Sequence, residues 1–236
     1  MSKDFFIIAG PCSVESQEQM EIIANDLSRY SDVVALRGGA FKPRTNPNSF
    51  QGLGKFGLDI LSLIKDKYKI PIVSELMSID DIELFKDVDV IQIGARNMQN
   101  FELLKAVGKL DKPIILKRGF GNTIDELIAS AEYIKQVGND KIILCERGIR
   151  TFETRTRFTL DISSVIVLKE LTNYPVIVDP SHAAGKSEYV IPLAKAAKAV
   201  GADGIIVEVH SDPLNALSDP EQQLTLEQFA QLYEEL

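Results

Sequence analysis

GIIVEVH, residues 204–210, is an apolar run that ends in an acid and a histidine. Near-continuous apolar runs are typical of parallel strands that are buried on both faces. Because side chains alternate along a strand, Glu208 and His210 share one face with Ile206, whereas Val207 and Val209 take the other. The stretch therefore predicts a strand that packs one face on helices and carries chemical groups at its carboxyl end.

Seven further runs of this kind precede it along the chain: FFIIAG (5–10), VVALRGG (33–39), PIVSEL (71–76), VIQIGA (90–95), PIILKRG (113–119), KIILCERG (141–148) and PVIVDPSH (175–182). Amphipathic segments alternate with them, such as residues 123–138, in which Thr123 and Glu126 form a capping box and Gly138 is the expected stop. Eight such units in 236 residues predict an α/β fold, a single (β/α)8 TIM barrel, rather than an open doubly wound sheet. No linker or low-complexity stretch divides the chain, so residues 1–236 are expected to form one domain.

The composition narrows the class of protein. The chain is 45% hydrophobic and 25% charged, fractions that are ordinary for a soluble globular protein. Its formal net charge of −8 argues against general nucleic-acid binding. No apolar run reaches the roughly 18 residues that a membrane helix needs. Two cysteines make no disulfide framework, which favours a reducing, cytoplasmic location.

Cationic side chains gather at the predicted strand ends and in the loops that follow them. They come from several different connections and are Arg37, Lys42, Arg44, Arg96, Lys117 and Arg147. In a parallel barrel these ends meet at one rim, where active sites are built. Cations that converge without matching acids require anionic ligands, and guanidinium forks suit phosphate and carboxylate groups. The sequence therefore predicts an anion-binding site despite the net negative charge.

A second group of residues has the donor types of a metal site. Cys12 follows the first predicted strand behind a Gly-Pro turn, and His182 and Glu208 end the seventh and eighth predicted strands. Either Asp212 or Asp219 of the last loop can supply a fourth ligand. Thiolate, imidazole and carboxylate together suit a divalent transition ion such as Mn, Fe or Zn.

Each of these residues also has an ordinary structural interpretation. A lone cysteine beside a strand is usually a small buried hydrophobe, and Cys145 is assigned to the core on that ground. The two histidines can be surface or capping residues, and Glu75 can simply pair with a neighbouring cation. Arg150, Arg155 and Arg157 can be solvated or can serve subunit contacts. The convergence of the whole set at strand ends, rather than any single member, favours a functional site.

Seven stretches in chain order carry a family resemblance: GPCSVES, LRGGAFKPRTNPNSFQG, QIGARNMQN, ILKRGF, ILCERGIRTFETRTRFTLDIS, VDPSHAAGK and IIVEVHSDPLNALSD. They resemble the 3-deoxy-D-arabino-heptulosonate 7-phosphate (DAHP) synthases, in the short type I-beta branch that is related to 3-deoxy-octulosonate 8-phosphate (KDO8P) synthase. The resemblance covers essentially the whole chain. It implies a metal-dependent transferase that condenses phosphoenolpyruvate with D-erythrose 4-phosphate and releases phosphate. This reaction is the first step of the shikimate pathway to chorismate and the aromatic amino acids.

The resemblance also implies roles for individual residues. The family's metal ligands fall on Cys12, His182, Glu208 and Asp219, which decides against Asp212, and the divalent ion would be Mn, Fe, Zn or Co. The family's phosphoenolpyruvate-binding cations match Arg37, Lys42, Arg96, Lys117 and Arg147. Its aldose-phosphate motif is KPRT, so Arg44 and Thr45 should hold the erythrose phosphate.

Several expectations about catalysis follow from this resemblance. Lys42, between the two substrate sites, is expected to deliver a proton to the new alkoxide. His210 and Glu75 are further candidates for placing water or a proton, and Asp179 for orienting His182 or a cation. The family suggests a homodimer or homotetramer. MSKD is too short for the N-terminal hairpin or regulatory domain of many relatives, so no regulatory domain is expected, and the barrel's own side chains or a neighbouring subunit should close its bottom.

Three alternatives are retained. KDO8P synthase uses arabinose 5-phosphate and carries a KANRS-type segment where this chain has KPRT, and Cys12 excludes its metal-independent subtype. A metal-dependent sugar-phosphate aldolase or isomerase would use the metal ligands but leave half of the cations unexplained. A non-catalytic barrel that binds a phosphorylated metabolite would not need the complete ligand set.

Overall fold

Eight parallel strands close into a barrel in sequence order, as the alternating pattern predicts. The computed structural model describes residues 5–42, 46 and 48–236. β1 pairs with β2 on one side and with β8 on the other, which closes the sheet. The strands are β1 (Phe6–Gly10), β2 (Val33–Arg37), β3 (Ile72–Glu75), β4 (Val90–Ile93), β5 (Ile114–Lys117), β6 (Ile142–Glu146), β7 (Val176–Val178) and β8 (Gly204–Glu208).

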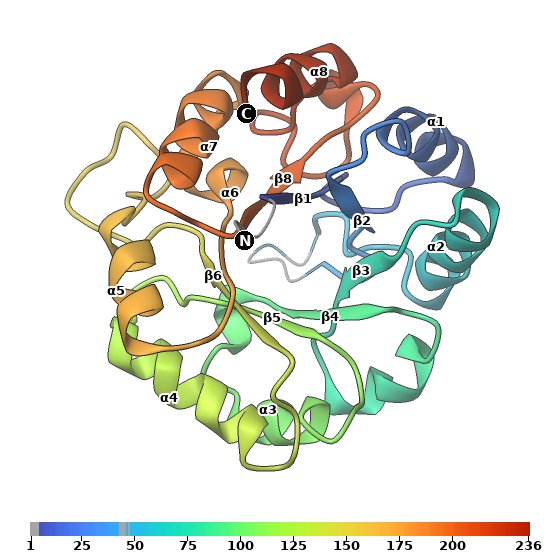
Figure 1. Cartoon of the computed structure of the whole chain (residues 1–236). Helices are drawn as coiled ribbons and strands as arrows, with labels where there is room; N and C mark the ends of the chain where they lie inside the picture. Colours follow the sequence, from blue (N-terminus) through green and yellow to red (C-terminus); the bar gives the residue numbers. More distant parts are fainter. Residues whose placement is uncertain (1–4, 43–45, 47) are drawn as a thin grey trace.

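Helices surround this barrel on all sides (Figure 1). The α-helices are α1 (Gln17–Leu27), α2 (Lys55–Tyr68), α3 (Phe101–Val107), α4 (Ile124–Lys135), α5 (Ser163–Leu171), α6 (Pro180–Ala184), α7 (Val190–Ala199) and α8 (Leu226–Glu235). Short 3-10 helices are η1 (Ile79–Phe85), η2 (Ala95–Asn97), η3 (Ser187–Tyr189) and η4 (Pro213–Asn215). The capping box predicted at Thr123 and Glu126 is present at the start of α4. Within the described residues, none of the helices has the length and apolar character needed to cross a membrane.

Two elements differ from the sequence prediction. The connection between β3 and β4 forms the 3-10 helix η1 rather than an α-helix. The predicted run 175–182 also divides, because Asp179 caps α6 by accepting a hydrogen bond from the backbone of His182. Aspartate at the N-cap followed by Pro180 is a strong helix start. His182 therefore lies on a short helix after β7 and not at the end of a strand.

The inside of the barrel is built in layers. The middle layer is apolar and consists of Ile8, Ala35, Val73, Ile115, Cys145, Ile177 and Ile206. Phe6, Val90 and Ile143 pack against it, so the barrel's own side chains contribute to closing its bottom. Two residues further along most strands, the same inward face carries a polar group: Arg37, Glu75, Gln92, Lys117, Arg147, Asp179 and Glu208. The apolar middle layer thus lies beneath a layer of charged and amide side chains.

β1 contributes no side chain to the polar layer. Its corresponding residue is Gly10, whose φ of 145° lies in a region that L-residues rarely adopt. A Cβ at this position would lie 2.2 Å from the carbonyl oxygen of Arg37 on β2. Glycine therefore lets β1 and β2 approach closely at the mouth, directly before Cys12.

Candidate active site

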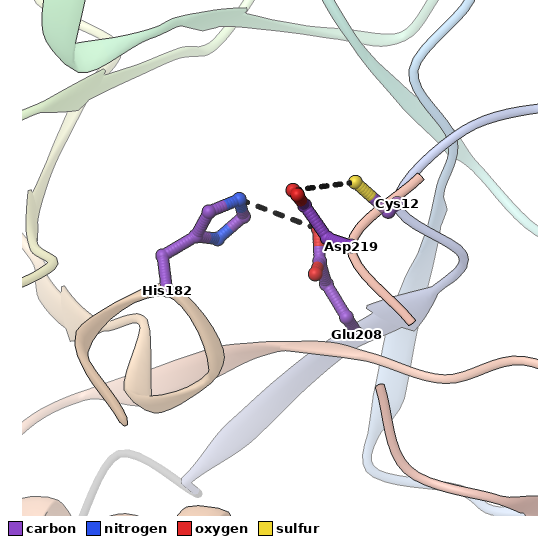
Figure 2. Close-up of side chains that lie close together, drawn as sticks. All are labelled: Cys12, His182, Glu208 and Asp219. Carbon is purple, nitrogen blue, oxygen red and sulfur yellow. Dashed lines mark hydrogen bonds and ion pairs between the residues drawn. The ribbon is translucent and has the colours of Figure 1, made fainter. Parts of the chain in front are cut away.

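Four possible metal ligands converge at the carboxyl end of the barrel (Figure 2). Cys12 follows β1, His182 lies on α6, Glu208 ends β8, and Asp219 lies in the loop after β8. One ligand atom from each lies within 4.8 Å of those of the other three. Cys12 Sγ donates to Asp219 Oδ2 over 3.2 Å, and His182 Nε2 lies 3.3 Å from Glu208 Oε1. We call these four residues the ligand group.

Burial and the neighbouring charges shift the pKa values of all four residues of the ligand group. Desolvation is the main cause that raises the pKa of Cys12, to about 12, and the Glu208 charge adds to it. Desolvation also lowers the pKa of His182, which favours the neutral imidazole. Burial opposes ionisation of Glu208 and Asp219, but nearby cations outweigh it and lower the pKa of both carboxyls. A neutral imidazole and two carboxylates are the protonation states that metal coordination requires.

One oxygen of Glu208 has the properties of an unused ligand atom. Glu208 is completely buried, and its Oε1 accepts no hydrogen bond within the described part of the chain. The nearest cationic groups are Arg37 Nη2 at 3.2 Å and His182 Nε2 at 3.3 Å. A buried carboxylate oxygen is costly unless it is satisfied. The residues present therefore fit a cation at the centre of the ligand group.

Lys42 connects the ligand group to the cations. Its Nζ lies 3.0 Å from both the sulfur and the carbonyl oxygen of Cys12. Burial disfavours the ammonium form, but Cys12 and Glu208 outweigh this effect and raise the pKa of Lys42. Lys42 is therefore a charged proton donor next to the ligand group.

A cavity of about 300 Å³ opens beside these residues. Its walls are formed by Lys42, Glu75, Arg96, Phe120, Arg147, Arg150, Arg157, Phe158, His182 and Asp219. Its floor continues to Arg37 and Lys117 at the end of the barrel. A larger hollow of about 410 Å³ flanks it and shares Arg157 and Asp219. The five predicted phosphoenolpyruvate-binding cations therefore line one connected space, and we call Arg37, Lys42, Arg96, Lys117 and Arg147 the cation group.

Two of the cations are buried without a full set of acidic partners. Arg37 contacts Glu208 through Nη2, whereas its Nη1 is buried and has no hydrogen-bond partner within the described residues. Arg147 is 3% exposed, and burial lowers its pKa to about 10. In the described part of the chain, no carboxylate forms an ion pair with Arg147. An anionic ligand would compensate both groups.

A pair of aromatic rings supports the arginines of this cavity. Phe120 and Phe158 stack with ring centres 5.1 Å apart and an interplanar angle of 9°. The Arg147 guanidinium carbon lies 4.2 Å from the Phe158 centre and 5.0 Å from the Phe120 centre. Arg96 and Arg150 lie 5.4 and 5.2 Å from the Phe120 centre. The negative ring faces attract the cations and hold them close together despite their mutual repulsion.

Asp179 contacts both a cation, Lys117, and a possible metal ligand, His182. Its Oδ2 accepts a hydrogen bond of 2.5 Å from Lys117 Nζ and lies 2.7 Å from His182 Nδ1. These contacts hold the pKa of Asp179 well below its usual value although burial opposes ionisation. The bond at Nδ1 leaves Nε2 facing Glu208, so Asp179 fixes which nitrogen of His182 faces the ligand group.

Not every residue singled out from the sequence reaches this cavity. Asp212 is exposed and accepts from Asn215, so it lies outside the ligand group. His210 is buried, does not line the described cavities, and its Nε2 lies 3.6 Å from Glu15 Oε2. The predicted phosphate-binding residues Arg44 and Thr45 lie outside the described residues.

Two charged strand-end residues point away from the barrel axis. Arg118 and Glu146 follow inward-facing residues by one position, so they face the helices. There Arg118 Nη1 donates to Glu146 over 3.0 Å and to Asp161 over 2.8 Å. The alternation of side chains along a strand distinguishes these two residues from their inward-facing neighbours.

Four residues of the cavity were missed by sequence reasoning. Arg150 and Arg157 were interpreted as solvated or interface residues, but both line the cavity. Phe120 and Phe158 were not singled out, although the GF of ILKRGF lies directly after a strand end. Their position in strand-to-helix loops was the available signal, because these loops build barrel active sites.

Four possible metal ligands and a cationic cavity share one barrel mouth, where barrel enzymes build their active sites. Comparison with known proteins identifies the family to which the chain belongs. The model of the DAHP synthetase I family matches residues 2–236. A phospho-2-dehydro-3-deoxyheptonate aldolase of Thermotoga maritima is 55% identical over 98% of this chain and 69% of its own length. The chain therefore belongs to the DAHP synthetase I family.

Solved structures agree with this assignment. A crystal structure of the Thermotoga maritima phospho-2-dehydro-3-deoxyheptonate aldolase (DAHP synthase) superposes with a TM-score of 0.95 at 56% identity, covering 98% of this chain and 68% of that one. A truncated form of 3-deoxy-D-arabino-heptulosonate 7-phosphate synthase from the same organism gives 0.91 at 52% identity, covering 98% and 84%. A 2-dehydro-3-deoxyphosphooctonate aldolase of Syntrophobacter fumaroxidans is only 32% identical, over 98% of this chain and 86% of its own length. The resemblance to DAHP synthases is confirmed.

Proposed function

We propose that the chain condenses phosphoenolpyruvate with D-erythrose 4-phosphate and releases phosphate, the first step of the shikimate pathway to chorismate and the aromatic amino acids. The observation that carries this proposal is the position of Lys42. It lies 3.0 Å from Cys12 Sγ and also lines the cavity that contains Arg96 and Arg147. A single lysine thus adjoins both the ligand group, which would hold a metal ion, and the cavity in which a polyanion would bind.

The cation group supports binding of phosphoenolpyruvate. That substrate carries a phosphate and a carboxylate, and the group offers three guanidinium forks and two ammonium groups. Arg37 Nη1, which has no hydrogen-bond partner among the described residues, and the buried Arg147 favour an anion at the floor of the cavity. We expect Arg44 and Thr45 of KPRT to bind the phosphate of erythrose 4-phosphate, as the family resemblance implies.

The ligand group supports a divalent ion of the Mn, Fe, Zn or Co type. Its thiolate, imidazole and carboxylate donors suit such ions, and Glu208 Oε1 accepts no hydrogen bond within the described residues. A divalent ion held by the ligand group would act as a Lewis acid toward the aldehyde oxygen of the second substrate.

The remaining chemistry belongs to the protein side chains. Carbon 3 of phosphoenolpyruvate forms the new bond to the aldehyde carbon, water adds at carbon 2, and phosphate leaves by cleavage of its C–O bond. Lys42, held charged beside Cys12, is the proposed donor of a proton to the new alkoxide. Glu75 lines the same cavity and accepts from Gln92, so it is placed to orient the water. His210 lies outside the described cavities, so its role in placing water or a proton would be indirect.

The proposal extends to the setting of the enzyme. Cys12 and Cys145 are both free and buried, which agrees with a reducing cytoplasm. The family resemblance supports a homodimer or homotetramer. It also leads us to propose that residues 1–236 form a single catalytic domain.

A side-by-side assay tests this function. Phosphate release from phosphoenolpyruvate is measured with erythrose 4-phosphate, with arabinose 5-phosphate and with no aldose, each before and after chelation. We expect release with erythrose 4-phosphate that chelation abolishes and that added metal restores. Preference for arabinose 5-phosphate would indicate the KDO8P alternative, whereas cleavage of a sugar phosphate without phosphoenolpyruvate would indicate an aldolase.

A further inference from the structure

Two adjacent glutamines lie buried behind the ligand group. Gln222 and Gln223, in the loop between η4 and α8, are 2% and 1% exposed. A buried amide is costly unless its oxygen and its nitrogen both find partners. In both residues they do: three of the four partners belong to segments that carry metal ligands, and the fourth is Arg157.

Gln223 joins the two ends of the chain. Its Oε1 accepts from the backbone N–H of Cys12 over 2.9 Å, and its Nε2 donates to the carbonyl oxygen of Ser218 over 2.9 Å. Ser218 immediately precedes Asp219, and its hydroxyl lies 2.6 Å from that of Ser13. A single carboxamide therefore ties the Cys12 loop to the Asp219 loop, and the two ligand side chains meet at 3.2 Å.

The backbone of Asp219 depends on such support. Its φ of 46° lies in the left-handed region, which is uncommon for residues other than glycine. A residue in this region persists when surrounding contacts determine its conformation. The bonds that Ser218 makes to Gln223 and Ser13 are the contacts directly beside it.

Gln222 acts on the third ligand. Its Nε2 donates to Oε2 of Glu208, and its Oε1 accepts from Arg157 Nη1 over 2.6 Å. Because Oε2 is occupied in this way, Oε1 is the oxygen that faces the ligand group, 3.3 Å from His182 Nε2. Arg157 also lies 3.8 Å from Asp219 Oδ2, so this series of contacts links Gln222 to Asp219 as well as to Glu208.

We propose that Gln222 and Gln223 are positioning residues that hold Cys12, Glu208 and Asp219 in place for a divalent ion. This inference rests on the metal site proposed above. Outer partners of metal ligands typically change metal affinity about 10- to 100-fold when they are removed. Each amide contributes a hydrogen-bond donor and an acceptor. Methionine has a similar length but neither group, so it should leave the four ligand residues intact while removing the bonds that hold them together.

The experiment measures Co²⁺ affinity of the full chain after chelation, for the unaltered protein and for Gln222→Met and Gln223→Met. The absorption of the cobalt–thiolate bond reports binding independently of catalysis. We expect the Kd for Co²⁺ to rise about 10- to 100-fold in each variant. Gln223→Met should also shift the cobalt–thiolate absorption, because Gln223 holds Cys12, whereas Gln222→Met should leave its position unchanged.

Asn139 provides a matched control for the loss of a buried amide. It is 5% exposed, and it bonds the carbonyls of Leu110 and Lys112 and the N–H of Lys141 at the opposite end of the barrel. Asn139→Leu should lower the thermal midpoint yet change the Kd for Co²⁺ less than threefold. If Gln223→Met does not fold, Gln223→Glu, which keeps an acceptor for Cys12, replaces it.

The outcomes separate the two proposals. A Kd within twofold of the unaltered protein in both glutamine variants would overturn the inference while leaving the metal site intact. An equal loss of affinity in Asn139→Leu would overturn it too, because the effect would then be general destabilisation. Absence of Co²⁺ binding by the unaltered protein would overturn the metal site itself.

Discussion

Cys12 shows how strongly surroundings determine the role of one side chain. It is fully buried, as an ordinary core cysteine would be, but its sulfur contacts Lys42 and Asp219 rather than apolar groups. Burial raises the pKa of this thiol to about 12, so the metal-free protein carries a proton there at neutral pH. A metal must displace that proton before the thiolate can bind it.

Metal affinity should therefore depend on pH. The lowered pKa of His182 favours its neutral imidazole, so the Cys12 proton is expected to be the main one released on metal binding. We expect the Kd for Co²⁺ to fall about tenfold for each unit rise between about pH 6 and 8. Titrations at three pH values measure the slope, and Cys12→Ala should bind weakly with little slope. A Kd independent of pH would contradict this prediction.

Phe120 should affect substrate binding through its ring. Three arginines lie within 5.4 Å of its centre, and losing the ring face removes an attraction of about 1 kcal/mol. Phe120→Leu keeps an apolar side chain, so we expect the KM for phosphoenolpyruvate to rise about fivefold. Phe101→Leu, which removes a ring stacked on Tyr133 outside the barrel, is the control and should leave this KM unchanged. Equal KM values for Phe120→Leu and the unaltered protein would show that Phe120 contributes only apolar packing and that its ring face does not affect substrate binding.

At the scale of elements, polar contacts on the outer side of β5 and β6 anchor the loop that carries the cavity arginines. Glu146 is fully buried and accepts from the backbone of Gly148, from Arg118 and from Ser164. Asp161 joins this network through Arg118 and accepts from the N–H of Ser164 in the first turn of α5. The loop between β6 and α5 is therefore fixed at both of its ends.

Asp161 makes this anchor sensitive to acid. Burial opposes its ionisation, but Arg118 and Ser163 outweigh that effect and lower its pKa. Its stabilisation is complete above the ordinary pKa of 3.8 and is lost as pH falls through the lower pKa of the folded protein. Asp161→Asn should cost about 1 kcal/mol at pH 7, allowing for partial exposure, and progressively less in acid.

Thermal midpoints of both proteins at pH 7 and near pH 3 measure the change with pH. Asp59→Asn removes an exposed ion pair with Lys55 on α2 and should have little effect at either pH. A difference between Asp161→Asn and the unaltered protein that stays constant with pH would contradict the prediction.

At the scale of the whole molecule, the ligand group joins both ends of the chain. Its members come from the loop after β1, from α6, from β8 and from the loop after β8. Metal binding should therefore stabilise the closed barrel, by about 2.7 kcal/mol at a concentration of 100 times the Kd. For a chain of this size we expect the thermal midpoint to fall by roughly 5–10 °C on chelation.

Thermal unfolding with chelator, and again after adding metal back, checks this expectation. Cys12→Ala should show a much smaller difference between the two conditions, because one ligand is missing. Identical midpoints for the unaltered protein with and without metal would indicate that no ion bridges these loops.

Sequence alone predicted most of the fold because all eight strands are apolar runs of a kind that only a buried parallel sheet requires. It placed Glu208 facing inward because alternation needs only counting from Ile206. It did not place His182 on α6, since an Asp-Pro helix start looks like the end of a strand. Nor did it find Phe120, Gln222 or Gln223, because their roles depend on partners distant in the sequence.

The layered interior limits where insertions and deletions can be accepted during evolution of the sequence. Successive side chains of β5 point alternately into and out of the barrel, so Lys117 faces the cavity and Arg118 faces the helices. Losing one residue from β5 would exchange these two orientations without altering any side chain. Insertions and deletions can therefore accumulate in the loops, but within a strand they are tolerated only in pairs.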